Sequence, residues 1–302
     1  MKWPAVQQAS QSGMKYGVYF PLISLFPLPR AYRMAQAWGR MEARRYPDLL
    51  ALIRTNAAQV LQPEELPAAD MGEKFFEVMS CDGIDAYASR IYSWRRLRRW
   101  VHITGEEQLF SAVSEKRGVL LLTFHFGGGS LIFPYLRSRG MSAHYLSIPL
   151  QRVRELEGWV QYTFSRLRFQ HIAQTMEREV IFVGGSKRKI QQVLGEGGMV
   201  VALLDVVPDF LHLKEWREVC FWGRPARFPT GLLSAAAQVD ATIVPFFGRV
   251  GEDHYRCLSF EEPCRATEPG ETLSVLVRLL EKYIRQYPYE WHHWPGLQGF
   301  YH

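Results

Sequence analysis

Short apolar runs alternate with segments of helical periodicity over the last two thirds of the chain. Most of these runs are aliphatic or β-branched and end at a polar residue or a glycine, which is typical of strands covered on both faces. The predicted strands are residues 119–123, 143–148, 180–183, 198–205, 241–247 and 254–260. The predicted helices are residues 108–116, 155–168, 186–194, 230–239 and 272–286. This alternation indicates βαβ units, so we expect an α/β fold with a mainly parallel central sheet flanked by helices.

The first hundred residues have a different pattern, with helical periodicity in residues 30–46, 49–61 and 71–92. Before them, residues 16–29 are apolar but contain three prolines. A helix needs about 20 apolar residues to span a bilayer, so this segment can enter an interface but is not expected to cross. We therefore expect residues 1–100 to form a helical, membrane-proximal extension packed on a main domain of residues 101–302.

Two interpretations fit the amphipathic pattern of residues 30–46 about equally well. Ala31, Met34, Ala35, Trp38 and Met41 lie on one side of this predicted helix, and arginines lie elsewhere. The apolar side can insert shallowly into a membrane while guanidinium groups meet phosphates. Alternatively, it can pack on the protein's own domain. The polar stretch of residues 1–13 has no apolar core, so no cleavable signal peptide is expected.

The amino-acid composition limits which kinds of protein and which binding partners fit this chain. The 302 residues are 47% hydrophobic and can bury a large core without disulfides. The four cysteines have neither CxxC pairing nor matching histidine spacing, so a structural zinc site is not expected. A net charge of +6 suits an anionic partner such as a membrane surface, a phosphorylated lipid or an acidic carrier protein.

One predicted strand leads directly into candidate chemistry. Residues 119–123 are followed by His125 and then by three glycines, Gly127, Gly128 and Gly129. Ligands of open α/β sheets bind at the carboxyl ends of the strands, which makes His125 a candidate general base. The alternative is a histidine that caps the strand, with glycines that only turn the chain.

A carboxylate ends another predicted strand in the same way. Asp205 follows the apolar run of residues 198–204, and if the two strands are parallel neighbours its side chain could orient the imidazole of His125. A helix N-cap or a buried arginine partner would also explain Asp205. Asp209 is a second candidate.

Anion-binding candidates are less specific. Arg224 precedes a helix that opens near Thr230, and Arg178 lies before the glycine pair at residues 184–185. Helix N-termini and arginines can hold phosphate, although an N-cap and surface charges would give the same pattern. Neither a P-loop nor GxGxxG is present, which disfavours nucleotide chemistry.

Several segments resemble one family in the same order along the chain. They are LFPLPRAYRMAQAWGRM, ALIRTNAAQVL, VHITGEEQLFSAVSEKRGVLLLTFHFGGG, VVALLDVVPD, FWGRPARFPTG with IVPFFGRV, and YIRQYPYEWHHW. Together they resemble the bacterial lipid A late acyltransferases, lauroyl and myristoyl transferases of the lysophospholipid acyltransferase superfamily. The resemblance implies transfer of a fatty acyl group from an acyl carrier protein or acyl-CoA thioester to a lipid hydroxyl or amine. It also implies a peripheral or monotopic protein at the cytoplasmic face of the bacterial inner membrane.

The resemblance makes His125 the general base but also contains a departure. From the residues themselves we expect the backbone N–H groups of Gly127 to Gly129 to be oxyanion donors and Arg152, Arg178, Arg224 and Thr230 to bind substrate. No metal, bound cofactor or nucleic acid is implied. The family's acid, which four residues separate from the histidine, is replaced by Ser130, which would be a neighbour of His125 or an acceptor-site group.

Three explanations of Ser130 remain open. Asp205 or another carboxylate replaces the acid, or the acceptor is a more acidic nucleophile, or the chain is a catalytically degenerate lipid- or carrier-binding scaffold. The family's Tyr-Arg-Pro is also altered, to Ser147, Ile148 and Pro149.

Overall fold

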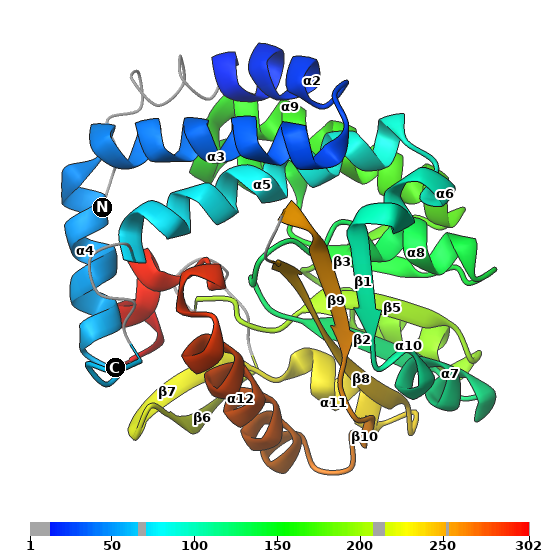
Figure 1. Ribbon diagram of the computed structural model, residues 1–302. Helices are drawn as coiled ribbons and strands as arrows, with labels where there is room; N and C mark the ends of the chain where they lie inside the picture. Colours follow the sequence, from blue (N-terminus) through cyan, green and yellow to red (C-terminus); the bar gives the residue numbers. More distant parts are fainter. Residues whose placement is uncertain (1–12, 66–70, 208–214, 252–253, 302) are drawn as a thin grey trace.

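The computed structural model describes residues 13–65, 71–207, 215–251 and 254–301 (Figure 1). Its central sheet has the strand order β1-β9-β8-β2-β5-β3-β4, with β10 beside β8. The strands are β1 (Val101–Thr104), β2 (Val119–Thr123), β3 (His144–Ser147), β4 (Val180–Phe182), β5 (Met199–Leu203), β8 (Thr242–Val250), β9 (Arg256–Phe260) and β10 (Cys264–Arg265). Only the pairs of β8 with β9 and with β10 are antiparallel. The predicted α/β fold with a mainly parallel sheet is confirmed.

The central strand β2 divides the interior into two layers. All five of its residues are buried, and it pairs in parallel with β5 on one side and β8 on the other. Side chains of a strand alternate between faces. Leu120 and Leu122 accordingly belong to one hydrophobic cluster, whereas Val119 and Leu121 belong to the other. The uninterrupted apolar run is therefore the consequence of helices on both faces of the sheet.

Helices cover each face of the sheet. α10 (Lys187–Gly195), α11 (Gly231–Ala237) and α12 (Pro269–Gln286) contribute to the cluster that contains Leu120. α7 (Glu106–Ser114), α8 (Ile132–Ser138) and α9 (Leu150–Met176) contribute to the other cluster. α9 is kinked at Gly158, whose φ of 86° and ψ of −177° are accessible essentially only to glycine.

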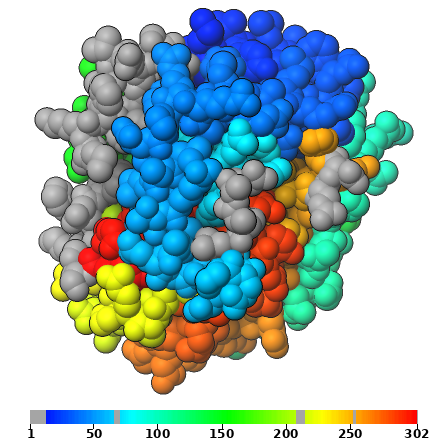
Figure 2. Space-filling model, turned by 60° about the vertical axis from the view of Figure 1, so that its left-hand side comes forward, coloured from blue at the N-terminus to red at the C-terminus, as the bar shows by residue number. Residues whose placement is uncertain are grey.

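The N-terminal helices pack on this domain. They are η1 (Lys15–Tyr19), α2 (Phe20–Ile23), α3 (Leu28–Arg45), α4 (Pro47–Ala58), α5 (Met71–Ile91), α6 (Trp94–Leu97) and η2 (Arg98–Trp100). Figure 1 shows α3 running alongside α5, and a side chain at Gly39 would collide with the backbone of Phe76. Figure 2 shows α3 and α4 forming a continuous outer face beside the C-terminal segment. No helix of the described ranges is long and apolar enough to cross a membrane. The division at residue 100 stays a prediction.

The apolar side of α3 is covered by the protein itself. Ala31, Tyr32 and Ala35 are buried in the same cluster as residues of α5. Of the two interpretations of residues 30–46, packing on the protein's own domain therefore describes most of this side. Met41 on this side of α3 is 49% exposed, and further exposed apolar side chains lie earlier, on η1, α2 and the following turn, among them Leu22 and Leu25.

Two features of the region after β5 were not predicted. β6 (Trp216–Phe221) and β7 (Arg224–Pro229) form a hairpin, whose turn places Trp222 and Gly223 at positive φ. The C-terminus adds the short helices η5 (Pro288–Glu290) and η6 (Trp294–Phe300), and Asn56 of α4 donates a hydrogen bond of 2.7 Å to the Trp294 carbonyl. These contacts join the two ends of the chain.

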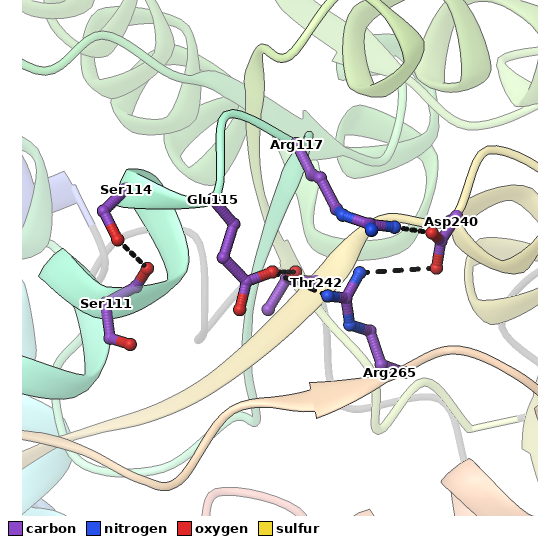
Figure 3. A network of polar contacts seen from close by, with 7 residues as sticks. All are labelled: Ser111, Ser114, Glu115, Arg117, Asp240, Thr242 and Arg265. Carbon is purple, nitrogen blue, oxygen red and sulfur yellow. Dashed lines mark hydrogen bonds and ion pairs between the residues drawn. The ribbon is translucent and has the colours of Figure 1, made fainter.

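A polar network closes the amino-terminal edge of the sheet (Figure 3). Arg265 of β10 contacts Glu115 at 2.8 Å and Asp240 at 3.4 Å, Arg117 pairs with Asp240, and Thr242 donates to Glu115. Since these ion pairs are between a third and two thirds exposed, each adds at most about 1 kcal/mol. The network lies at the opposite ends of β2 and β8 from His125, so we assign it a structural role.

Candidate active site

His125 and Asp205 meet where two neighbouring parallel strands end. His125 follows β2 and Asp205 follows β5. The backbone N–H of His125 donates to Asp205 Oδ1 at 2.8 Å, and His125 Nδ1 lies 2.9 Å from the same oxygen. The sequence-based expectation that both side chains emerge at one sheet edge is met. The alternatives for Asp205, a helix cap or an arginine partner, are not what the structure contains.

The C-terminal segment holds this pair in place. The indole N–H of Trp291 donates to Asp205 Oδ2 at 2.9 Å. Backbone hydrogen bonds run from His292 N to the His125 carbonyl at 2.8 Å and from Gly127 N to the Glu290 carbonyl at 2.7 Å. Both oxygens of the Asp205 carboxylate are thereby occupied, which fixes its orientation toward the imidazole.

A second histidine lies against the first. His293 Nε2 is 2.9 Å from His125 Nδ1 and 3.9 Å from Asp205 Oδ2, and the two rings lie 4.4 Å apart between centroids. The sequence contained His293 only within the WHHW segment, with no spacing that linked it to His125. Its position results from the return of the C-terminus to the sheet edge, which no local pattern predicts.

The electrostatics keep Asp205 ionised and His292 and His293 neutral. Complete burial alone would raise the pKa of Asp205, but His125, His293 and the Trp291 N–H outweigh it, so this pKa lies below its usual value. Burial lowers the pKa of His292 to about 4 and that of His293 to about 3. A buried carboxylate beside an imidazole can stabilise a proton on that imidazole.

His125 opens into a hollow of about 750 Å³, and its side chain is 37% exposed there. Cavities of this size suit organic ligands. Because Nδ1 is engaged by Asp205 and His293, Nε2 is the ring nitrogen left for a ligand. A smaller hollow of about 110 Å³ adjoins the site, and Asp82, His125, Tyr145, Arg168, Leu203 and His292 line both.

The walls of the larger hollow are mostly apolar with a polar side. Apolar side chains from several elements line it: Val153, Phe164, Phe169, Ile190, Leu203 and Leu232. The polar side includes Lys187 and Glu215, which form an ion pair at 2.8 Å. Ser147 and Ile148, at the altered Tyr-Arg-Pro position, also line it and bring no cation.

Close packing requires two of the three glycines after His125, Gly127 and Gly128. The N–H of Gly127 donates to the Glu290 carbonyl and that of Gly128 to the Gly248 carbonyl, at 2.7 and 3.3 Å. A side chain at Gly128 would collide with the buried ion pair of Arg256 and Asp85. The expected oxyanion role is therefore wrong for Gly127 and Gly128, because both N–H groups are already used. A Cβ at Gly129 would meet nothing within 4 Å, and Gly129 lines the smaller hollow.

Ser130 is close to the site but not bonded to its histidine. It is half-buried and lines the smaller hollow. Asp205, not Ser130, contacts the ring nitrogen of His125. Asp209 lies outside the described residues.

The other predicted substrate-binding residues do not reach the hollows. Arg152 contacts Glu155 at 3.1 Å on α9, and Arg178 is exposed just beyond that helix. Arg224 lies 3.8 Å from the Tyr301 ring centroid on the outside of the β6–β7 hairpin, and Thr230 is buried at the start of α11. The structure does not bring these four residues to His125. Charge and turn patterns in the sequence do not specify which side of an element faces the sheet edge, so they could not show this.

Three donor atoms of the site could hold a metal ion. Those of His125, Asp205 and His293 lie within 4.8 Å of one another. Two imidazoles and a carboxylate are common ligands of divalent transition metals. In the structure the same atoms are linked by hydrogen bonds, and the expectation that no metal is needed stays a prediction.

A comparison with known families decides the assignment. The family model described as bacterial lipid A biosynthesis acyltransferase matches residues 16–294, which includes every residue of the site. The chain belongs to this family. No curated protein matches it. For the lipid A biosynthesis acyltransferase family, membership implies acyl transfer, with an acyl donor and a lipid acceptor as substrates. The resemblance found in the sequence is thereby confirmed.

Proposed function

We propose that this protein transfers a fatty acyl group from an acyl carrier protein or acyl-CoA thioester to a hydroxyl or amine of a lipid, with His125 as the general base. The observation that carries the proposal is the contact of 2.9 Å between His125 Nδ1 and the buried carboxylate of Asp205. It replaces the acid missing at Ser130. Asp205 holds a proton on Nδ1 and leaves Nε2 free toward the hollow, the arrangement that a general base requires.

The reaction follows from this arrangement. His125 Nε2 takes the proton of the acceptor hydroxyl or amine as its oxygen or nitrogen attacks the thioester carbonyl carbon. The imidazolium is stabilised by the ionised Asp205. When the tetrahedral intermediate collapses, the carbonyl re-forms, the C–S bond breaks, and the leaving thiolate receives the proton from Nε2.

The apolar walls of the larger hollow suit the acyl chain of the donor. His125 lines both hollows, so a thioester held beside it can extend into either. Burial of each methylene contributes about 0.8 kcal/mol.

An exposed apolar surface supports docking on a membrane near this hollow. We define the apolar rim as Val18, Leu22, Leu25, Phe26, Leu156 and Trp159, each at least 40% exposed. Arg30 lies over Phe26 at 5.9 Å and Arg154 over Trp159 at 4.0 Å, so guanidinium groups accompany the apolar side chains. Tyr16 and Phe164 join the two parts of the rim at 4.6 Å between ring centroids, and both line the larger hollow.

This arrangement would let an acceptor lipid pass from the bilayer to His125. Apolar insertion with adjacent arginines is the pattern of monotopic attachment to anionic lipid. We propose that the protein acts in this way at the cytoplasmic face of the bacterial inner membrane.

Incubation with labelled acyl carrier protein or acyl-CoA and a total lipid extract tests the proposal. Mass spectrometry should find a lipid whose mass has increased by one acyl group, and His125→Ala should not form it. Thioester and lipid binding without any acylated product would instead support the scaffold, the alternative suggested by Ser130. The carboxylate beside His125 at an open hollow favours the transferase, since a scaffold has no need of it.

A further inference from the structure

The smaller hollow contains polar atoms that lack hydrogen-bond partners in the described part of the chain. Thr123 Oγ1 and His292 Nε2 are buried and have no such partner there. The carboxylate of Asp82, on α5, has neither a hydrogen bond nor an ion pair among the described residues. All three side chains line this hollow together with His125. Buried polar atoms in proteins are nearly always hydrogen-bonded, so the hollow suits a polar ligand.

The chemistry of these atoms favours a hydroxyl as the ligand. Burial lowers the pKa of His292 to about 4, against the charge of Asp82, which raises it, so this ring is neutral. A neutral imidazole and a hydroxyl can each donate and accept hydrogen bonds, whereas a carboxylate only accepts them. A ligand hydroxyl can therefore donate to Asp82 while its oxygen accepts from a neighbouring donor. An ammonium group cannot accept, so it would leave the hydroxyl proton of Thr123 without a partner.

The size of the smaller hollow suits a head group and not an acyl chain. Its volume is about 110 Å³, compared with about 750 Å³ for the larger hollow. A water molecule takes about 30 Å³ in the liquid, so the smaller hollow has room for about four groups of that size. The acyl chain of the donor has room only in the larger hollow, which leaves the smaller one for the acceptor.

The proton count of the reaction shows what Asp82 requires. An attacking hydroxyl has a single proton, and His125 Nε2 takes it. The same hydroxyl therefore cannot also donate to Asp82. The donor for Asp82 must be a second group of the acceptor, and this group lies next to the attacking one because Asp82 and His125 line the same small hollow.

We propose that the smaller hollow binds the head group of the acceptor lipid, and that this head group contains a vicinal diol, as in glycerol or a sugar. The inference rests on the proposed function and narrows its acceptor. One hydroxyl of the diol attacks: its oxygen forms the new C–O bond, the C–S bond breaks, and its proton passes through His125 Nε2 to the thiolate. The neighbouring hydroxyl keeps its proton, which it donates to Asp82.

The first experiment removes vicinal diols from the total lipid extract before the assay. Periodate cleaves the carbon–carbon bond between adjacent hydroxyl-bearing carbons, and borohydride then reduces the aldehydes to separate alcohols. The matched control is extract treated with borohydride alone. With wild type and labelled thioester, we expect the periodate-treated extract to give at least about tenfold less acylated lipid, because a hydrogen bond to a charged group is lost. The product should release its label in mild alkali, as an ester does and an amide does not.

The second experiment tests the residues. Asp82→Asn should raise the lipid concentration at half-maximal rate at least about tenfold, with the thioester KM within about threefold of wild type. Glu73→Gln is the matched control, because Glu73 is a half-buried acidic residue of the same helix that lines neither hollow, and it should behave as wild type does. Thr123→Val should raise the same lipid concentration about two- to tenfold without loss of thermal stability, because its hydroxyl has no partner among the described residues. A purely structural role would lower stability instead.

The inference is overturned if the periodate-treated extract supports acylation as well as its control, if the product is an amide, or if Asp82→Asn uses the lipid as wild type does. Wild type and His125→Ala with untreated extract distinguish this failure from that of the proposed function. If wild type forms no acylated lipid there, or if His125→Ala retains full activity, the proposed function itself is wrong.

Discussion

Replacement of Asp205 by asparagine removes one negative charge from the site at almost constant shape. In the wild type that charge lies 2.9 Å from His125 Nδ1. Two unit charges at this separation attract by about 6 kcal/mol at an effective dielectric constant of about 20. The imidazolium spreads its charge over the ring and its side chain is 37% exposed. About half of that energy, roughly 3–4 kcal/mol, should therefore appear in the barrier, which is about 10²–10³-fold in kcat.

The assay is acyl transfer with saturating thioester, and thermal unfolding verifies that each variant is folded. Ser130→Ala is the control, because Ser130 lines the smaller hollow without bonding to His125. We expect this variant to stay within about threefold of wild type. If Asp205→Asn were as active as wild type while Ser130→Ala lost most activity, the assignment of Asp205 as the replacement acid would be refuted.

Two further predictions concern stability and membrane binding. Burial raises the pKa of Glu290 to about 7, whereas the usual value for this carboxyl in an unfolded chain is 4.5. The folded protein therefore holds the proton more tightly than the unfolded chain, and its free energy of unfolding falls as the pH rises between these two values. Glu290→Gln should therefore equal wild type in chemical denaturation at pH 4.5 and exceed it by about 2–3 kcal/mol at pH 8; equal stability at pH 8 would contradict this. For the apolar rim, Leu22→Glu with Leu25→Glu should lower partitioning onto anionic vesicles at least about tenfold, because two exposed leucines lose their insertion energy. Val275→Glu, a control on α12 with 47% exposure, should bind as wild type does, and equal binding by all three proteins would exclude the rim as the docking surface.

Much of the fold could be predicted from the spacing of apolar residues along the sequence alone. The apolar run of β2 and its neighbours is long enough, and sufficiently free of polar residues, to require cover on both faces, and the structure has that cover. The β6–β7 hairpin was missed because Arg217 and Glu218 are adjacent and break the alternation of β6, and because β7 contains two prolines. Its turn also contains Trp222 at positive φ, which is uncommon for a bulky side chain. The length of α9 was also missed, since its kink at Gly158 interrupts the period.

Only the site residues that directly follow a predicted strand could be predicted from the sequence. His125 and Asp205 both follow apolar strands, so parallel pairing brings them together. His293 and Arg168 come from segments whose approach depends on tertiary packing. The predictions for Arg224 and Arg178 did not hold, because an arginine near a turn fits a phosphate-binding pattern equally well when its side chain points to solvent.

The central claim is that His125 removes a proton from a lipid acceptor during acyl transfer. Its most direct test is the single-turnover rate of acylated lipid formation by wild type and His125→Ala, measured with one preparation of labelled thioester and the same lipid extract. The account predicts a labelled lipid with the wild type and a rate at least about 10³-fold lower with the variant. Equal rates for the two proteins would contradict it.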